Sequence, residues 1–379
     1  MSIVDRVASR MGYERRSQPD ASWAAIGGNV GFHSALSARA AENISAVLAC
    51  GNAIATALAS IPAIIYKRQG EARIEDYKHP LTRIMRRGWN SAMTWPDGME
   101  HLVISTLLTG NGLAQIERTE RGQIAGLRFI PWHWVNVSEL RSGRLAYDVS
   151  DGKGRSWRLL EGEVIHLRDR TDDGLIGRSR LSRAYNTVES VRASNDFARN
   201  FMANNAQPGG VIQSAATMTT EQKTMLRSQM SDRFTKQKVG SVMVLDGGLT
   251  WETVQISPED AELLETRKFG IEEICRLFHV PPPLVQDYSH NTFTNSETAG
   301  RWFAMFCLAP WARKIEAEFA RSVFPIDGPH EMELDLSGFL RGDPTTRWQA
   351  HAIALANGVL DPDEVREVEG WNPRPAVQV

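Results

Sequence analysis

Three consecutive prolines, at residues 281–283, restrict the possible fold of this chain more than any other feature. Proline fixes φ and has no amide hydrogen, so no helix can run through the triplet. A helical apolar pattern covers residues 258–279 before it, and we expect Asn295 or Ser296 to cap another helix after it. The sequence therefore predicts two helices joined by a stiff corner and a polar loop over residues 286–295.

The 379 residues carry a formal net charge of -2, with 42% hydrophobic and 23% charged residues. This composition is typical of a globular protein of two or three domains. It argues against a protein that coats nucleic acid through bulk positive charge, although it permits weaker contact with DNA.

The three cysteines, Cys50, Cys275 and Cys307, are far apart and form no CxxC motif. This spacing argues against a disulfide framework or a zinc site, and we expect three buried thiols in a reducing compartment.

One apolar stretch, residues 46–62, is long enough to suggest a membrane span. It is mostly alanine, however, and Asn52 and other polar residues interrupt it. Val47, Ile54, Leu58 and Ile61 recur at helical spacing, so we interpret the stretch as a buried helix.

Residues 44–170 combine helical with strand-like patterns. After an N-terminal arm that we expect to be flexible or ordered only on a partner, helices are predicted at 44–60, 79–87 and 94–109 and a strand at 63–68. Six strand-like segments follow between residues 113 and 167, separated by glycines. These patterns predict an α+β domain with a mostly antiparallel sheet.

The second half is mainly helical. A long helix is predicted at 179–205, and a β-α-β-β unit follows over about 50 residues. In that unit, Thr219–Gln222 is a capping box and Asp246-Gly-Gly a hairpin turn. Beyond the prolines we expect a kink at Pro310, a strand at 332–336, and helices at 344–357 and 361–370.

No sequence motif for catalysis is present: there is no P-loop, GxGxxG, GxSxG or HExxH. The Gly110-Asn-Gly112 stretch is too short to bind a phosphate and is typical of a turn entering a strand. The histidines are scattered without ligand spacing. We therefore expect no enzyme activity, no cofactor and no metal.

Several short motifs follow one another in order along residues 44–340. They are Pro62-Ala-Ile-Ile-Tyr, His79-Pro-Leu, Leu107-Leu-Thr-Gly-Asn-Gly-Leu-Ala, Val164-Ile-His-Leu, Gly174-Leu-Ile-Gly-Arg-Ser-Arg-Leu, Asn205-Ala-Gln-Pro-Gly-Gly, Ser257-Pro-Glu-Asp and Ile274-Cys-Arg-Leu-Phe-His-Val-Pro-Pro. This ordered set resembles the HK97-type portal proteins of tailed bacteriophages and of related prophage or gene transfer agent particles. Gly177-Arg-Ser-Arg departs from the family, which often has a small residue and proline there.

The resemblance implies a homo-oligomeric ring, usually of twelve subunits, at one vertex of the virion capsid, assembled in the cytoplasm of a bacterial host. Double-stranded DNA would pass through its axial tunnel, pumped by the large terminase subunit. A head-tail adaptor and the major capsid protein would be further partners, and no membrane would be involved.

The resemblance also implies a portal fold with an α/β wing, two long stem helices, a small clip, a kinked tunnel helix and a short helical crown. The expected divisions are an arm at 1–43, a wing at 44–177, stem helices at 178–206 and 258–280, a clip at 207–257, a segment at 281–340 with the tunnel loop, kinked helix and a wing strand, and a crown at 341–379.

The two predicted stem helices have opposite charge. Residues 178–205 contain five arginines against two acids, a sum of +3, and residues 259–276 contain six acids against three bases, a sum of -3. We hypothesise that the basic helix, through Arg183, Arg192 and Arg199, packs on the acidic helix of a neighbouring subunit. The alternative is two solvated faces without pairing.

If the acidic helix lines the tunnel, Glu262, Glu265, Glu272 and Glu273 would repel DNA phosphates and keep DNA from adhering. Firmer contact would then come from the loop. Its residues are Gln286, Asp287, Tyr288, Ser289, His290, Asn291, Thr292, Phe293, Thr294 and Asn295. The alternative is a plain connector between helices.

Two other classes of function stay open on the sequence. One is a metal-dependent enzyme acting on nucleic acid, such as a nuclease with a site assembled from scattered acids. The other is a generic oligomeric scaffold that forms a ring without a tunnel.

Overall fold

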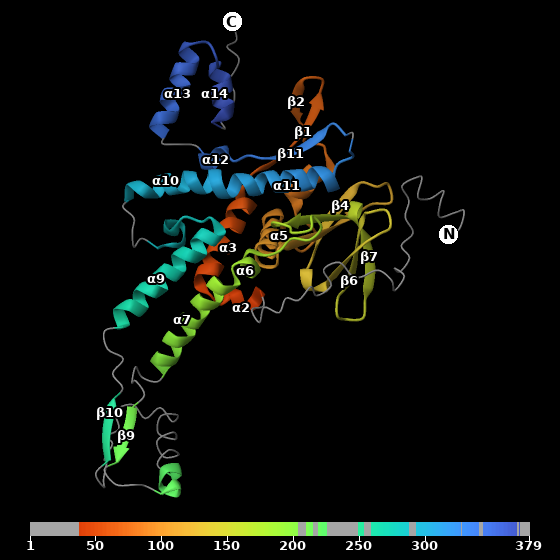
Figure 1. Cartoon of the computed structure of the whole chain (residues 1–379). Helices are drawn as coiled ribbons and strands as arrows, with labels where there is room; N and C mark the ends of the chain where they lie inside the picture. The colour runs from red at the N-terminus through yellow and green to blue at the C-terminus, as the bar shows by residue number, and fades with distance from the viewer. Residues whose placement is uncertain are drawn as a thin grey trace.

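Two helices, α3 (Ser45–Ser60) and α5 (Trp95–Thr109), pack against each other at the centre of the part of the chain that contains the main core, which we call the body (Figure 1). Thr94 and Asp97 cap α5 reciprocally: the Thr94 hydroxyl accepts from the Asp97 amide, and the Asp97 carboxylate accepts from the Thr94 amide. Gly110 ends the helix at a φ of 90°. Both helices begin and end within a residue of the predicted bounds.

The structure is a computed structural model. It describes residues 38–203, 210–214, 219–225, 249–253, 259–287, 293–326, 328–340, 344–369 and 371.

The N-terminal boundary of the body lies earlier than predicted. Helix α2 (Ala38–Glu42) falls in the stretch assigned to the arm, and Ala41 is fully buried in the main core. The body therefore includes at least the last residues of that stretch, because a buried methyl group contributes to packing even on a short helix. Residues 1–37 lie outside the described part.

The strands of the body lie in three separate antiparallel sheets, whereas one sheet was predicted. All six strands predicted between residues 113 and 167 are present, as is the strand at 63–68. The sheets are β4-β3-β8 (Ile124–Ile130, Asn111–Arg118, Val164–Arg168), β5-β6-β7 (Val135–Glu139, Leu145–Ser150, Ser156–Leu160) and β11-β1-β2 (His330–Leu334, Ala63–Gln69, Ala72–Glu75).

The sheets separate because each covers different apolar side chains. Sheet β5-β6-β7 contributes Val137, Leu145 and Leu159 to a small core that it shares with sheet β4-β3-β8, whereas β4 and β8 also reach the main core around α3 and α5. Strand β11 comes from the far end of the chain and pairs with β1 in the register Ala63 to Leu334. The strand predicted at 332–336 is thus present, two residues earlier.

A long helix crosses the body after the triple proline. It consists of α10 (Phe293–Phe303), the π-helical segment η4 (Ala304–Leu308) and α11 (Ala309–Ser322). The helix begins before Asn295, so the predicted cap there is wrong. Pro310 lies in the first turn of α11, where its missing amide hydrogen is tolerated. The irregularity expected at Pro310 takes the form of the preceding π-helical segment, and α10 and α11 follow one line in Figure 1.

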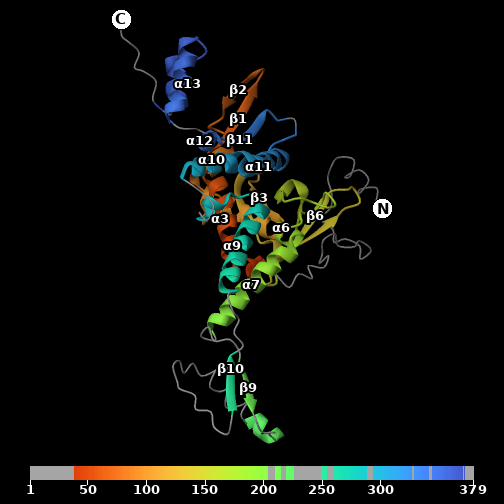
Figure 2. The same ribbon diagram turned by 60° about the vertical axis from the view of Figure 1, so that its left-hand side comes forward.

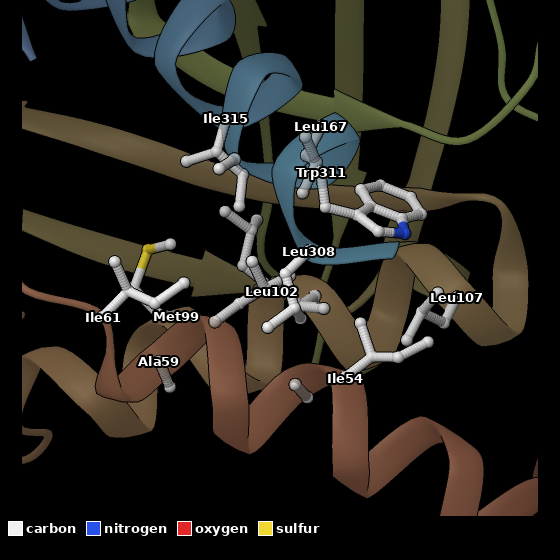
Figure 3. Packing of buried hydrophobic residues seen from close by; sticks show 14 of the residues in the cluster. Ile54, Ala59, Ile61, Met99, Leu102, Leu107, Leu167, Leu308, Trp311 and Ile315 are labelled. Carbon is white, nitrogen blue, oxygen red and sulfur yellow. The ribbon is translucent and has the colours of Figure 1, made fainter. Parts of the chain in front are cut away.

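The main core lies between this helix and the pair α3 and α5 (Figure 3). Ile54 of α3, Leu102 and Leu107 of α5, and Trp311 and Ile315 of α11 are all buried there. The apolar stretch at 46–62 is therefore the buried helix that its periodicity predicted. None of the helices in the described ranges is both long enough and apolar enough to span a bilayer.

The predicted long helix at 179–205 is broken near its start. Helix α6 (Arg180–Arg183) is separated from α7 (Tyr185–Ala203) by Ala184, whose ψ of 36° lies outside the helical region. Helix α7 then packs along α9 (Glu259–Phe278), where a Cβ on Gly270 would lie 3.0 Å from the Val191 side chain. Glycine lets the two helices approach closely at this point.

Helices α7 and α9 lead to a small unit that Figures 1 and 2 place at one end of the molecule. Its strands β9 (Gly210–Ser214) and β10 (Leu249–Thr253) are antiparallel. The predicted capping box is present: the Gln222 amide donates to the Thr219 hydroxyl at 3.4 Å, and the Thr219 amide donates to the Gln222 side chain at 3.0 Å. The predicted hairpin at Asp246-Gly-Gly lies outside the described residues.

Short helices complete the chain. Helix α4 (Pro80–Arg87) begins after His79, as predicted, and α12 (Ser337–Leu340) follows β11. Helices α13 (Pro344–Ala356) and α14 (Pro362–Val368) match the predicted pair. Figures 1 and 2 place α13 at the opposite end from β9 and β10.

Two buried carboxylates of α11 bind the open edges of two sheets. Glu316 accepts a hydrogen bond from the Leu334 amide of β11 at 2.9 Å, and Glu318 accepts one from the His166 amide of β8 at 2.8 Å. Both strands are sheet edges, so these amides have no strand partner. The helix therefore joins two sheets through hydrogen bonds as well as through apolar packing.

We predict that Glu318→Ala lowers the free energy of unfolding by about 2–4 kcal/mol, because it leaves the buried His166 amide and the Ser322 hydroxyl without their acceptor. Urea denaturation measures the change. Glu265→Ala, at an exposed position of α9, is the matched control and should stay within about 0.5 kcal/mol of the parent. Equal losses in the two variants would contradict the role assigned to Glu318.

Candidate functional site

The corner after α9 begins with a helix cap on a non-glycine residue. His279 adopts a left-handed φ of 57°. The Val280 amide donates to the Cys275 carbonyl at 3.0 Å, and the His279 amide donates to the Arg276 carbonyl at 3.2 Å. These paired bonds are a Schellman motif, and the buried Val280 side chain supplies its apolar contact. The helix therefore ends at Phe278, three residues before the first proline.

The triple proline then makes a second cap of the same kind. Pro281 is extended, and the 3-10 helix η3 (Pro282–Val285) ends at Gln286, whose φ is 64°. The Gln286 amide donates to the Pro283 carbonyl and the Asp287 amide to the Pro282 carbonyl, both at 3.1 Å. Two left-handed caps with prolines between them form a stiff corner, as the sequence predicted.

Arg180 satisfies the remaining carbonyl groups at the end of α9. Its guanidinium donates to the carbonyls of Phe278 at 3.3 Å and Leu277 at 3.5 Å. With the two bonds of the Schellman motif, the last four carbonyls of α9 all have partners. A cation at this end also stabilises the helix dipole. Arg180 further lies over the Trp311 ring, with 5.3 Å between guanidinium carbon and ring centroid.

Asp169 holds Arg180 in place at 2.9 Å from the body side. The Asp169 carboxylate is 5% exposed, so this ion pair is largely shielded from solvent. The Asp169 amide donates to the Gly110 carbonyl at 2.9 Å. A Cβ on Gly177 would lie 2.0 Å from that same carbonyl oxygen, so only glycine fits where these two segments cross. The contact between the body and the end of α9 therefore depends on two glycines, Gly110 and Gly177, and on the ion pair of Asp169 with Arg180.

A buried polar network lies beneath this crossing. The Asn111 side-chain oxygen accepts from the Gly177 amide at 2.8 Å and from His166 Nε2 at 3.0 Å, and the Asn111 side-chain nitrogen donates to the Gly177 carbonyl at 2.8 Å. Because Asn111 Oδ1 only accepts, His166 must carry its proton on Nε2. His166 Nδ1 then accepts from the Tyr147 hydroxyl at 3.0 Å. Burial holds the pKa of His166 well below its usual value.

Gly110-Asn-Gly112 is the turn into a strand that the sequence predicted, but the sequence did not identify partners for Asn111 and His166. A signal was present in the sequence, because each is a polar residue inside an apolar strand pattern. Buried polar groups of this kind need hydrogen-bond partners, which only the fold could identify.

The predicted acidic residues share one face of α9. Glu262, Glu265 and Glu272 follow at spacings of three and seven residues, with Glu273 adjacent. Glu265 is exposed, and Glu272 and Glu273 are partly exposed. Glu262 lies in the helix, and its side chain is outside the described part. The face also includes Arg276, which pairs with Glu272 at 2.7 Å.

The predicted basic residues have acidic partners within the chain. Arg183 binds Asp172 at 2.6 Å, which lowers the pKa of that carboxyl. Arg199 lies 3.0 Å from Asp196, and Arg192 lies 3.7 Å from the same carboxylate. These ion pairs need no neighbouring subunit, so the hypothesis of pairing between subunits stays a prediction.

The predicted loop is only partly described. Gln286 and Asp287 are the last residues of the corner, and residues 288–292 lie outside the described ranges. Phe293, Thr294 and Asn295 belong to the first turn of α10. The candidate loop is therefore shorter than predicted, because the helix begins earlier.

Three large apolar side chains are exposed where α10 meets η4. Trp302, Met305 and Phe306 are 60%, 55% and 66% exposed and adjacent on the helix. The buried side of the same turns is also apolar and includes Phe303, Cys307 and Leu308. A segment apolar all round is atypical of a solvated surface helix. Across the described ranges, no three His, Cys, Asp or Glu side chains gather as a metal site would require.

We predict that His279→Gly raises the free energy of unfolding by about 0.5–1 kcal/mol, because glycine adopts the left-handed conformation without a Cβ clash. Thermal and urea denaturation both measure it. Lys268→Gly, at an exposed position inside α9, should instead cost about 1 kcal/mol. A loss in both variants would exclude a strained cap at His279.

We predict that the buried His166 makes the stability of the protein depend on pH. His166 stays neutral in the folded state, whereas an unfolded histidine takes up a proton below pH of about 6.5. Stability should therefore be fully present above this value and fall as pH decreases, by up to about 1.4 kcal/mol per pH unit. Unfolding measured between pH 5.5 and pH 7 should show a shallower slope in His166→Gln, whatever its absolute stability. Equal slopes would mean that His166 titrates normally.

Comparison with known proteins gives consistent matches over nearly the whole chain. The family model described as phage portal protein matches residues 45–370. The probable portal protein of Streptomyces phage phiC31 is 31% identical over 376 residues, covering 93% of this chain and 78% of the relative. The portal protein of Enterobacteria phage HK97 is 27% identical over 346 residues, covering 89% and 80%.

A solved structure has a similar fold. It is a chain of the neck of a native gene transfer agent particle computed with C12 symmetry, with a TM-score of 0.59 and 21% identity. The match covers 98% of this chain and all of the other.

Proposed function

This chain belongs to the phage portal protein family, and we propose that it forms a ring at one capsid vertex, through whose axial tunnel a terminase motor packages double-stranded DNA and DNA later leaves. The observation that carries the proposal is the family match over residues 45–370, because this range includes the body, the α7 and α9 pair, the corner and the C-terminal helices. The family is structural, so the chain acts by forming a passage, without chemistry of its own.

In this proposal the body with its three sheets is the wing, and α7 and α9 are the stem. The unit of β9 and β10 is the clip, and α13 and α14 are the crown. The opposite placement of the clip and α13 supports this division, because a tunnel needs subunits that extend along its axis (Figure 2). The corner at residues 279–287 is then the fixed end from which the tunnel loop starts.

The acidic face of α9 is the proposed tunnel lining. Glu265 is exposed and Glu272 and Glu273 are partly exposed, so these carboxylates are accessible to DNA. Like charge prevents phosphates from binding, and a pore that passes DNA quickly must bind it weakly. Gln286 and Asp287 lead into the loop that we propose makes the closer contact.

Twelve subunits are the proposed ring number, by analogy with the C12 neck of the similar particle. We propose the apolar stripe of Trp302, Met305 and Phe306 as a principal contact between subunits. Large aromatic side chains that are exposed in a single subunit are typical of positions that become buried when subunits assemble. The arginines of α6 and α7 already pair with acidic residues of their own subunit, so they would contribute less to the contact between subunits. The terminase, a head-tail adaptor and the capsid protein are the other proposed partners, in a virion assembled in the host cytoplasm.

Electron microscopy of the purified full chain tests the main proposal. A ring with a central hole as wide as a DNA duplex, about 20 Å, supports it; flat rings without a passage would indicate a scaffold instead.

We predict that Phe306→Ser reduces ring assembly at least about tenfold, measured by mass photometry over a concentration series, because a central aromatic contact is worth about 2 kcal/mol or more. Thermal stability of the subunit should change little, since the side chain is 66% exposed. The matched control is Ile326→Ser, an exposed apolar residue beyond the end of α11. Unchanged rings in Phe306→Ser would place the contact elsewhere.

A further inference from the structure

Two cysteines from distant parts of the sequence lie side by side at the C-terminal end of α9. Cys50 lies in the middle of α3 and Cys275 in the last turn of α9, 225 positions apart, and their sulfur atoms are 3.9 Å from each other. Both residues belong to the main core and are almost completely buried. A disulfide has sulfur atoms about 2.05 Å apart, so a displacement of roughly 2 Å would join them.

The two thiols are chemically different. Cys50 donates its S–H to Cys275, and this hydrogen bond lowers the pKa of the Cys275 thiol. The same contact and burial raise the pKa of Cys50. Cys275 is therefore the better nucleophile, because the thiolate is the reactive form.

The third cysteine has a different partner. The Cys307 thiol donates to the Phe278 carbonyl at 3.6 Å, and burial raises the pKa of Cys307 to about 12. Cys307 therefore stays a protonated, unreactive thiol, and its reaction with an oxidant can be compared with that of the other two cysteines.

We propose that Cys50 and Cys275 are an oxidisable pair whose disulfide ties α3 of the body covalently to the last turn of α9. With a peroxide as oxidant, the Cys275 thiolate attacks one oxygen of H2O2 and becomes a sulfenic acid, releasing hydroxide that takes up a proton to form water. The Cys50 thiol then attacks the sulfenic sulfur, the S–S bond forms and a second water leaves. Two thiols and one peroxide give one disulfide and two waters.

The position of the bond gives it a structural consequence. Cys275 also supplies the carbonyl that accepts from Val280 in the cap of α9. A disulfide at this residue would hold the end of α9 against α3 independently of Arg180. It would form when the protein passes from a reducing cytoplasm to an oxidising medium. Because both sulfurs are buried, the reaction requires transient opening of the contact between α3 and α9.

Peptide mapping tests the proposal directly, because trypsin places the three cysteines in different peptides. Cys50 falls in residues 40–67, Cys275 in residues 269–276 and Cys307 in residues 302–313. The full chain is treated with hydrogen peroxide, with and without a low urea concentration that increases opening. It is then alkylated, digested and analysed by mass spectrometry.

The expected product is peptide 40–67 joined to peptide 269–276, reversed by dithiothreitol, with Cys307 alkylated. Oxidised protein should melt about 5 °C higher than reduced protein, as expected for a cross-link that closes a long loop. Cys275→Ser should lose both the cross-link and the shift, whereas Cys307→Ser should keep both. A cross-link to peptide 302–313, sulfinic acids without a cross-link, or no cross-link under either urea condition would overturn the proposal.

Discussion

The contact between Arg180 and the end of α9 is the interaction on which the rest of the arrangement depends. One guanidinium group binds the Asp169 carboxylate of the body, two terminal carbonyls of α9 and the ring of Trp311 in α11. Removing it would leave the Leu277 carbonyl without a donor and the buried Asp169 carboxylate without its cation. Arg180 is thus the residue at which the body, α9 and the long helix of α10 and α11 meet.

A second layer positions that contact. Asp169 is placed by the Gly110 carbonyl, and Gly110 lies against Gly177, which Asn111 binds through both of its side-chain polar atoms. His166 and Tyr147 complete the network beneath. Three of the motifs that resemble the family, those that contain Asn111, His166 and Gly177, therefore contact one another next to α6.

Much of the local structure could be predicted from the sequence, because it depends on neighbouring residues. Thr94 and Asp97 cap α5 as their spacing indicated, and Thr219 and Gln222 do the same for the helix that begins at Thr220. The triple proline ends α9 and begins a stiff corner. The predictions that failed were those where local signals compete with packing: the start of α10 before Asn295, the break at Ala184, and the burial of Ala41.

The sequence by itself determined the order and type of the elements, the acidic face of α9 and, through its ordered motifs, the family. These follow from periodicity, capping residues and proline, which act over a few residues of chain. Only the tertiary structure decided that the strands divide into three sheets, that β11 returns to β1, and that Cys50 lies beside Cys275. Such pairings join residues hundreds of positions apart, and they form because buried edges, carboxylates and apolar faces must find partners in space, which no local pattern specifies.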